Sequence, residues 1–176
     1  MEKGYIQVYT GDGKGKTTAA LGLGMRAAGR GLKVLMIQFL KGTHTGELES
    51  IKKLAPQFSV VRFGETGKFF FSMDQAEKDE LKRKINEELD RLDDMLRDQE
   101  WDVLILDEIL GTIENGLVSL ERVLEILDAR PEGMEIVLTG RVLPDKIAQR
   151  AHLITEMRSI KHYFDIGVSA RDGIEK

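Results

Sequence analysis

The chain has 176 residues, of which 41% are hydrophobic and 32% are charged, a balance typical of a globular protein and unlike that of a disordered chain. Its 26 basic and 30 acidic residues give a formal net charge of −4, which argues against a nucleic-acid partner. The absence of cysteine excludes disulfides, thiolate zinc sites and cysteine nucleophiles. Because there is no signal-peptide core and no apolar run of about 20 residues, we expect a cytoplasmic protein without a membrane partner.

Short apolar runs alternate with helix-like segments along the chain. In chain order the predicted elements are a strand over 5–10, a helix over 16–30, a strand over 33–39, a helix over 46–54, a strand over 59–63, a helix over 74–97, a strand over 102–106, a helix over 119–127, a strand over 135–139, a short helix after Pro144 and a strand over 152–156. The second strand is too apolar to have a solvent-facing side, which indicates burial on both faces.

The longest predicted helix carries a single apolar stripe on an otherwise charged surface. Apolar residues recur there at spacings of three and four, at Leu81, Ile85, Leu89, Leu92 and Leu96. Ser72, with Gln75 three residues later, predicts a capping box at the start of this helix.

The alternation of strands and helices favours an α/β sandwich with a mostly parallel sheet that is buried on both faces. No internal repeat or linker divides the sequence, so we expect residues 1–176 to form a single domain. Residues 160–176 have no clear periodicity. His162, Tyr163 and Phe164 crowd together there, which indicates that this tail packs on the domain.

A glycine-rich turn follows the first strand and reads Thr-Gly-Asp-Gly-Lys-Gly-Lys-Thr-Thr over residues 10–18. Glycine lets the backbone approach an anion closely with its amides directed inward, and the following helix adds the positive end of its dipole. Lys16 offers a charge to the phosphates and Thr17 a hydroxyl to Mg²⁺. Thr10 stands where the strict phosphate-loop pattern has glycine. The alternative is a lysine-glycine surface turn that binds nothing.

An acidic pair, Asp107 and Glu108, follows the apolar strand over 102–106. Open α/β sheets bind ligands at the carboxyl ends of their strands, and one of these two carboxylates would hold a metal directly or through water. Alternatively, the pair only ends the strand and caps the next helix. Together with the glycine-rich turn, it predicts a site for a magnesium nucleotide.

Motifs along nearly the whole chain match those of one known family. They are the glycine-rich turn, Gly-Arg-Gly-Leu-Lys-Val-Leu at 29–35, Gln-Phe-Leu-Lys-Gly at 38–42, Leu-Asp-Glu at 106–108 and Leu-Thr-Gly-Arg at 138–141. The most specific part is the tail, with Thr-Glu-Met-Arg at 155–158, Ile-Lys-His at 160–162, Phe-Asp at 164–165 and Gly167. In these motifs the chain resembles the ATP:corrinoid adenosyltransferases, the cob(I)alamin adenosyltransferase family of the P-loop type.

The resemblance implies a P-loop NTPase-like, three-layer α/β sandwich with about six strands. It implies an enzyme that transfers the 5′-deoxyadenosyl group of ATP to the Co(I) centre of a reduced corrinoid and releases inorganic triphosphate, in adenosylcobalamin biosynthesis or salvage. Family members bind ATP in the reverse sense along the phosphate loop, so that the ribose faces the corrinoid. Mg²⁺ as cofactor, a homodimer and an electron-donating flavoprotein partner are implied as well.

The resemblance also implies roles for individual residues. The catalytic pair would be Lys16 and Glu108, and the metal would be held by Thr17 and Glu108. Arg141, after the fifth strand, would approach either the phosphates or the next helix. For both Arg141 and Arg26 the alternative is an ordinary surface salt bridge. The residues expected to bind ATP are Gly11, Asp12, Gly13, Lys14, Gly15, Lys16, Thr17, Thr18 and, as a contact to the nucleoside, Arg26.

The corrinoid side is expected at the loop over residues 64–71, where the family carries an aromatic motif that faces the corrinoid. Phe69 and Phe70 are the expected contacts, as an apolar lid over the lower face of the cobalt; the alternative is that they close the core against the long helix. Lys68 stands at the motif's first aromatic position, and Arg171 in the tail stands where glutamine is common. These departures concern the corrinoid side more than the ATP site.

Two other functions fit parts of the sequence. A P-loop small-molecule kinase or ATPase would present the terminal phosphate to an acceptor and commonly has an arginine-rich lid, which this sequence lacks. A non-catalytic nucleotide- or corrinoid-binding module would bind the same ligands without turnover. His162 faces the ligands in one interpretation and is packed and hydrogen-bonded in the other.

Overall fold

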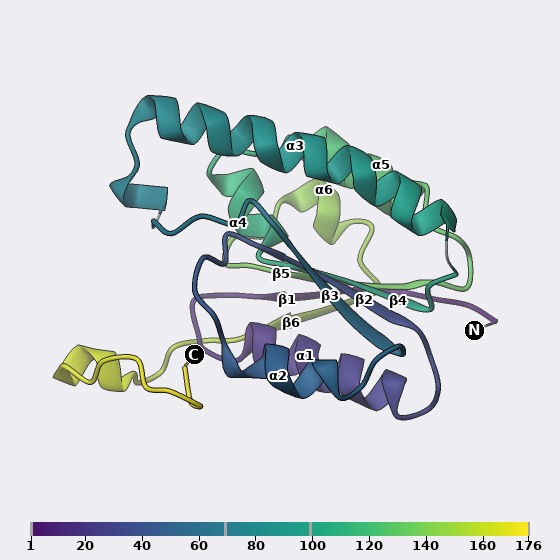
Figure 1. Cartoon of the computed structure of the whole chain (residues 1–176), viewed down its shortest axis with the longest axis horizontal. Helices are drawn as coiled ribbons and strands as arrows, with labels where there is room; N and C mark the ends of the chain where they lie inside the picture. The colour runs from purple at the N-terminus through teal and green to yellow at the C-terminus, as the bar shows by residue number, and fades with distance from the viewer. Residues whose placement is uncertain (1, 69, 99, 176) are drawn as a thin grey trace.

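The computed structural model describes residues 2–68, 70–98 and 100–175, and its strands form one parallel sheet in the order β3-β2-β4-β5-β1-β6 (Figure 1). The strands are β1 (Ile6–Thr10), β2 (Val34–Phe39), β3 (Phe58–Phe63), β4 (Val103–Asp107), β5 (Glu135–Thr139) and β6 (Leu153–Glu156). The helices are α1 (Lys16–Ala28), α2 (Gly46–Lys52), α3 (Gln75–Asp98), α4 (Ile109–Glu114), α5 (Leu120–Asp128) and α6 (Asp145–Ala148), with short 3₁₀ turns η1 (Phe70–Ser72) and η2 (Tyr163–Ile166).

Helices cover both faces of the sheet, which confirms the predicted α/β sandwich. Figure 1 shows α1 and α2 on one face and α3, α4, α5 and α6 on the other. Alternate side chains of each strand enter the two cores: in β2, Leu35 and Ile37 pack on the α3 side, while Val34 and Met36 pack on the α1 side. All residues of β2 and β4 are buried, as the apolar composition of the second predicted strand indicated.

Small residues let α1 lie close to the sheet. Its buried positions include Ala20, Gly24 and Ala28, which recur every four residues on one side of the helix. A Cβ atom at Gly24 would lie only 2.6 Å from the Phe58 ring of β3. This close packing holds α1, which directly follows the glycine-rich turn, against the sheet.

The long helix α3 buries the predicted stripe, but its capping box differs from the prediction. Leu81, Ile85, Leu89 and Leu92 are buried, and Leu96 packs partly buried against the same core. The cap is made by Asp74 and Glu77, two residues after the predicted pair of Ser72 and Gln75. The Glu77 amide donates to Asp74 Oδ1 (2.9 Å), and the Asp74 amide donates to Glu77 Oε2 (3.1 Å).

One helix was missing from the sequence prediction. The six-residue α4 follows Glu108 directly, with Glu108 in the left-handed conformation at φ 65°. Such a short segment with a glycine at its centre has no recognisable helical period.

Among the described residues no helix combines the length and apolarity needed to cross a membrane.

Candidate active site

A cleft of about 690 Å³ opens at the carboxyl ends of the strands, where open α/β sheets place their ligands. It is lined by the glycine-rich turn, by the segments that follow β2, β4 and β5, and by the carboxyl-terminal tail. Its polar and charged lining includes Asp12, Lys14, Lys16, Thr17, Lys41, Glu47, Glu108, Arg141, His162 and Glu175.

Lys16 lies across the glycine-rich turn with its ammonium group over the loop carbonyls. Its Nζ donates to the carbonyl oxygens of Gly11 and Gly13, both at 2.7 Å. Burial lowers the pKa of Lys16 below its ordinary value, and the nearby Glu108 carboxylate opposes this shift. A buried cation with only carbonyl partners can exchange them for the oxygens of a phosphate, which carry full negative charge.

The first amides of α1 surround the same position. Gly15 precedes the helix at φ 114°, a conformation that favours glycine, and the Ala19 amide donates to the Gly15 carbonyl at 2.8 Å. The four amides that begin an α-helix have no partner within the helix and point along its axis. They therefore point to the space in front of Lys16 and Thr17, where an anion would accept their hydrogen bonds.

Two glycines of the turn have a second role, because the tail packs against them. The Gly13 amide donates to the Met157 carbonyl at 2.7 Å, and the Met157 amide donates to the Thr10 carbonyl at 2.8 Å. A Cβ atom at Gly11 would lie 2.4 Å from the Met157 oxygen, and one at Gly13 would lie 2.7 Å from the Arg158 carbonyl carbon. Glycine at these two positions thus leaves room for the tail to contact the loop, in addition to allowing a phosphate to approach the backbone closely.

The acidic pair after β4 is joined to the turn through Asp107. Its Oδ1 accepts hydrogen bonds from the hydroxyls of Thr17 (2.8 Å) and Thr139 (2.7 Å). The Thr139 hydroxyl in turn accepts the Glu108 amide at 2.8 Å. Thr139 ends β5, which lies between β1 and β4 in the sheet, so it holds the acidic pair in register with the glycine-rich turn.

The other oxygen of Asp107 fits the requirements of a metal ion. Oδ2 is buried and has no hydrogen-bond partner among the described residues, and Lys41 Nζ lies 3.7 Å away. Mg²⁺ is typically held by one or two carboxylates together with substrate phosphates, so the absence of a cluster of three or more His, Cys, Asp or Glu in the described ranges is compatible with it. Asp107 and Thr17 thus form a suitable donor pair.

Glu108, the predicted metal ligand and catalytic residue, lines the cleft beside Asp107. Burial, and after it the Asp107 carboxylate, raises the pKa of Glu108 above its ordinary value. The structure therefore places both carboxylates at the site and hydrogen-bonds Thr17 to Asp107. The predicted metal role of Glu108 stays a prediction, and Asp107 joins it as a candidate.

The two arginines singled out from the sequence lie in different places. Arg141 lines the cleft, and its carbonyl accepts the Thr10 hydroxyl at 2.9 Å. Arg26 lies exposed in the last turn of α1, ten residues beyond Lys16. At 1.5 Å per residue, that is about 15 Å along the helix, so Arg26 does not line the cleft. Its predicted contact to the nucleoside remains untested.

The loop predicted to face the corrinoid lies beside the cleft. The Thr66 carbonyl packs so closely on Gly42 that a side chain there would overlap it, and Gly42 follows Lys41 of the cleft. Phe70 is half-buried against the core, with Lys78 Nζ 5.1 Å from its ring centre, while Phe71 is 82% exposed. Phe69, the other predicted contact, lies outside the described residues.

Three charged residues in the cleft lining were missed as site candidates by the sequence interpretation. Lys41 and Glu47 stand at the carboxyl side of β2, and Glu175 is in the tail. Lys41 lies in the Gln-Phe-Leu-Lys-Gly motif at 38–42, but the sequence interpretation gave it no function. The preceding Leu40 adopts φ 58°, a conformation uncommon outside glycine, which only the structure reveals. His162 lines the cleft and also caps η2, since its Nδ1 accepts the Phe164 amide at 3.0 Å.

Comparisons with known proteins match nearly the whole chain to one family. The model of the family described as ATP:corrinoid adenosyltransferase BtuR/CobO/CobP matches residues 2–175. Corrinoid adenosyltransferases of Escherichia coli K12 and Salmonella typhimurium LT2 are each 36% identical over 175 residues, which is 99% of this chain and 86% of theirs. That of Pseudomonas aeruginosa PAO1 is 33% identical over 175 residues, 99% of this chain and 84% of its own.

Among solved structures, a chain of EssC (ATPases 2 and 3) from Geobacillus thermodenitrificans aligns with 96% of this chain and 35% of its own. The TM-score is 0.46 and the sequence identity 15%, values too low to support an inference about this protein.

Proposed function

The chain belongs to the ATP:corrinoid adenosyltransferase family BtuR/CobO/CobP, and from this premise we propose that it transfers the 5′-deoxyadenosyl group of ATP to the Co(I) centre of a reduced corrinoid. The protein is an enzyme of the corrinoid adenosyltransferase class. ATP as the donor, release of intact triphosphate and a place in adenosylcobalamin biosynthesis or salvage are the finer parts of the proposal.

The observation that carries the proposal is the hydrogen bond between Thr17 of the phosphate loop and Asp107 of β4, beside the buried Lys16. This arrangement brings a cation, helix amides and a carboxylate oxygen without a hydrogen-bond partner in the described part of the chain to one end of the sheet. That combination is suited to a metal-bound polyphosphate.

In the transfer, the lone pair of Co(I) forms a bond to C5′ of the ribose while the C5′–O bond breaks. The bonding electrons leave with the triphosphate, so no proton has to be removed and no general base is needed. The protein contributes in two ways: it positions C5′ against the cobalt, and it stabilises the charge that develops on the leaving triphosphate.

Residues of the cleft are suited to stabilising the leaving group. Lys14, Lys16 and the amides that begin α1 would bind the triphosphate. Asp107, Thr17 and Glu108 would hold Mg²⁺, which when bound neutralises part of the phosphate charge. Arg141 lines the same cleft and adds a further positive charge near the phosphates.

On the corrinoid side, Phe69 and Phe70 would provide apolar contacts next to the cleft. The contact of the loop over residues 64–68 with Gly42 supports this position. We further propose a homodimer and an electron-donating flavoprotein that keeps the cobalt reduced; both stay predictions.

An anaerobic assay of chemically reduced cobalamin with MgATP tests the proposal. The expected products are a light-sensitive alkyl-cobalt compound, followed by its absorption spectrum, and one intact triphosphate per turnover. Release of phosphate or diphosphate would point instead to a kinase or ATPase. Binding of both ligands without an alkyl-cobalt product would identify a non-catalytic binder.

A further inference from the structure

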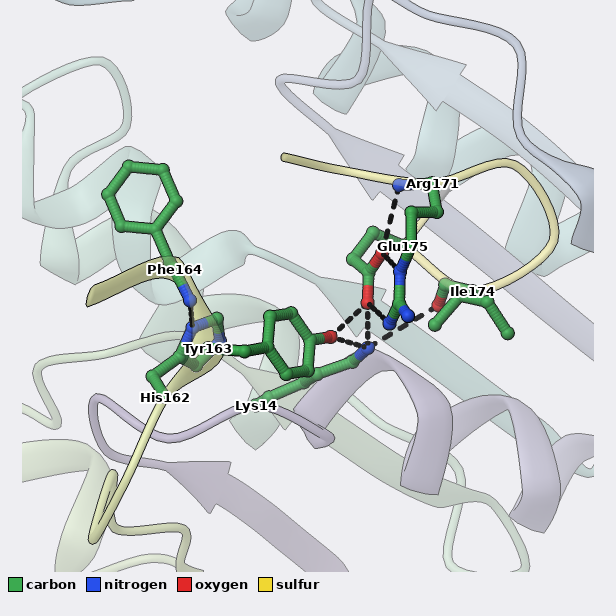
Figure 2. Close-up of polar contacts among 7 residues, drawn as sticks. All are labelled: Lys14, His162, Tyr163, Phe164, Arg171, Ile174 and Glu175. Carbon is green, nitrogen blue, oxygen red and sulfur yellow. Dashed lines mark hydrogen bonds and ion pairs between the residues drawn. The ribbon is translucent and has the colours of Figure 1, made fainter. Parts of the chain in front are cut away.

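The carboxyl-terminal tail places a carboxylate against the first lysine of the phosphate loop (Figure 2). Lys14 Nζ lies 2.8 Å from Glu175 Oε1 and donates to the Tyr163 hydroxyl at 3.0 Å. The Tyr163 hydroxyl donates to the same Oε1, and Arg171 Nη2 lies 3.2 Å from it. Three donors from two distant parts of the chain therefore converge on one oxygen.

This donor set is the kind that binds phosphate. Lysine and arginine only donate hydrogen bonds, and the guanidinium fork matches the oxygens of a phosphate as well as those of a carboxylate. Arg171, then Lys14 and Tyr163, lower the pKa of Glu175 far below its ordinary value, so the carboxylate is an anion at any physiological pH. The protein thus supplies its own anion to this group of donors.

Of these donors Lys14 lines the proposed triphosphate site, and Tyr163 and Arg171 adjoin it through their contacts with Glu175. Lys14, Ile174 and Glu175 line the same cleft as Lys16 and Thr17. The side chains of Lys14 and Arg171 are 43% and 52% exposed, so the ion pairs with Glu175 are in contact with water. Ion pairs of this kind are weak, and a ligand that carries several negative charges can replace a single carboxylate.

We propose that Lys14, Tyr163 and Arg171 form a binding subsite for the outer phosphates of the nucleotide, and that Glu175 occupies this subsite until the nucleotide displaces it. The inference rests on the proposed function, and it adds two residues of the tail to the triphosphate site. Arg171 stands where the resemblance leads one to expect glutamine, so this chain carries a charge there of its own.

Substitutions of Arg171 and Glu175, the two partners of one ion pair, are expected to change the affinity for phosphate ligands in opposite directions. Arg171→Gln removes a phosphate ligand and should weaken binding of magnesium tripolyphosphate and MgATP about three- to tenfold. Glu175→Gln removes the competing anion and should tighten binding of both about two- to fivefold. Binding of adenosine, which has no phosphate, should be the same in both variants.

Calorimetric titration of the full chain with each of the three ligands makes the measurement. Arg150→Gln and Asp128→Asn are matched controls, because Arg150 Nε and Asp128 Oδ1 form a comparable surface ion pair at 2.8 Å away from the cleft. Neither control should change the affinity for tripolyphosphate. If the pair of Arg171 and Glu175 only fastened the tail, both variants would weaken binding together.

Weaker or unchanged tripolyphosphate binding in Glu175→Gln would overturn the inference, as would unchanged binding in Arg171→Gln. The proposed function fails by a different observation, namely no alkyl-cobalt product from the unaltered chain. The failure of the inference can therefore be told apart from the failure of the proposed function.

Discussion

At the scale of single residues, the site depends on which side chains the sheet brings into contact. Thr17, Asp107 and Thr139 come from three segments of the chain and are joined by two hydrogen bonds to Asp107 Oδ1. Composition and spacing predicted the acidic pair but not which carboxylate Thr17 would contact. That choice is made by the register of β1, β4 and β5, a non-local property that adjacent residues in the sequence do not encode.

Lys16→Ala should reduce ATP affinity and turnover strongly, because it removes an ammonium group that lies buried across the glycine-rich turn. A charged hydrogen bond contributes about 1.5–3 kcal/mol, so we expect a loss of affinity of at least about tenfold. Titration with MgATP measures it. Unchanged ATP binding would contradict the assignment of the phosphate loop.

Asp107→Asn and Glu108→Gln separate the two candidate metal ligands. If Asp107 holds Mg²⁺, its amide variant should need a concentration of Mg²⁺ at least about tenfold higher for half-maximal ATP binding, and Glu108→Gln should need a smaller increase. The Mg²⁺ dependence of ATP binding is the measurement, with thermal unfolding as the check on folding. If Glu108→Gln needs the larger increase in Mg²⁺ concentration instead, Glu108 is the main metal ligand.

At the scale of elements, the phosphate loop and the tail form one structural unit. The main chain at Met157 is bonded to Thr10 and Gly13, and η2 and Glu175 continue the tail along the cleft. The sequence predicted the strands to within about two residues of their observed ends, because β1–β5 are short, apolar and bounded by turns. The tail has no such period, so its course could be found only in three dimensions.

Gly13→Ala should destabilise the protein by about 1–3 kcal/mol, because a methyl group there overlaps the main chain of Met157 and Arg158. Gly22→Ala is the matched control: Gly22 lies exposed in α1 with no atom within 4 Å of a new Cβ, so the change should stabilise by about 0.5–1 kcal/mol. Denaturant unfolding measures both. Equal stability of the Gly13 variant and the unaltered protein would contradict the contact between loop and tail.

Phe70→Ala tests the loop beside the cleft. If Phe70 contacts the corrinoid, transfer should be slower while ATP affinity stays nearly normal; the exposed Phe71 provides Phe71→Ala as a comparison. Single-turnover rates and ATP titrations make the distinction. Equal losses of both quantities would show that Phe70 serves the core, against which it packs in this structure.

At the scale of the whole molecule, one parallel sheet positions both apolar cores and the cleft. Its two apolar cores hold α1 on one face and α3 on the other, and its carboxyl edge gathers the phosphate loop, the acidic pair, Arg141 and the tail. The fold class and the glycine-rich turn were predictable because they rest on local periodicity and on a motif of nine adjacent residues. Lys41 and Glu175 were not, since their place at the cleft depends on Leu40 adopting a left-handed conformation and on the tail folding back.

We propose that the glycine-rich turn binds the triphosphate with the sugar directed at a corrinoid. A crystal structure of the protein with MgATP and a corrinoid measures this directly. We expect the three phosphates to lie against residues 13–18 and the ribose C5′ to face the cobalt. An adenosine buried in the protein, with the terminal phosphate pointing towards the second substrate, would contradict it.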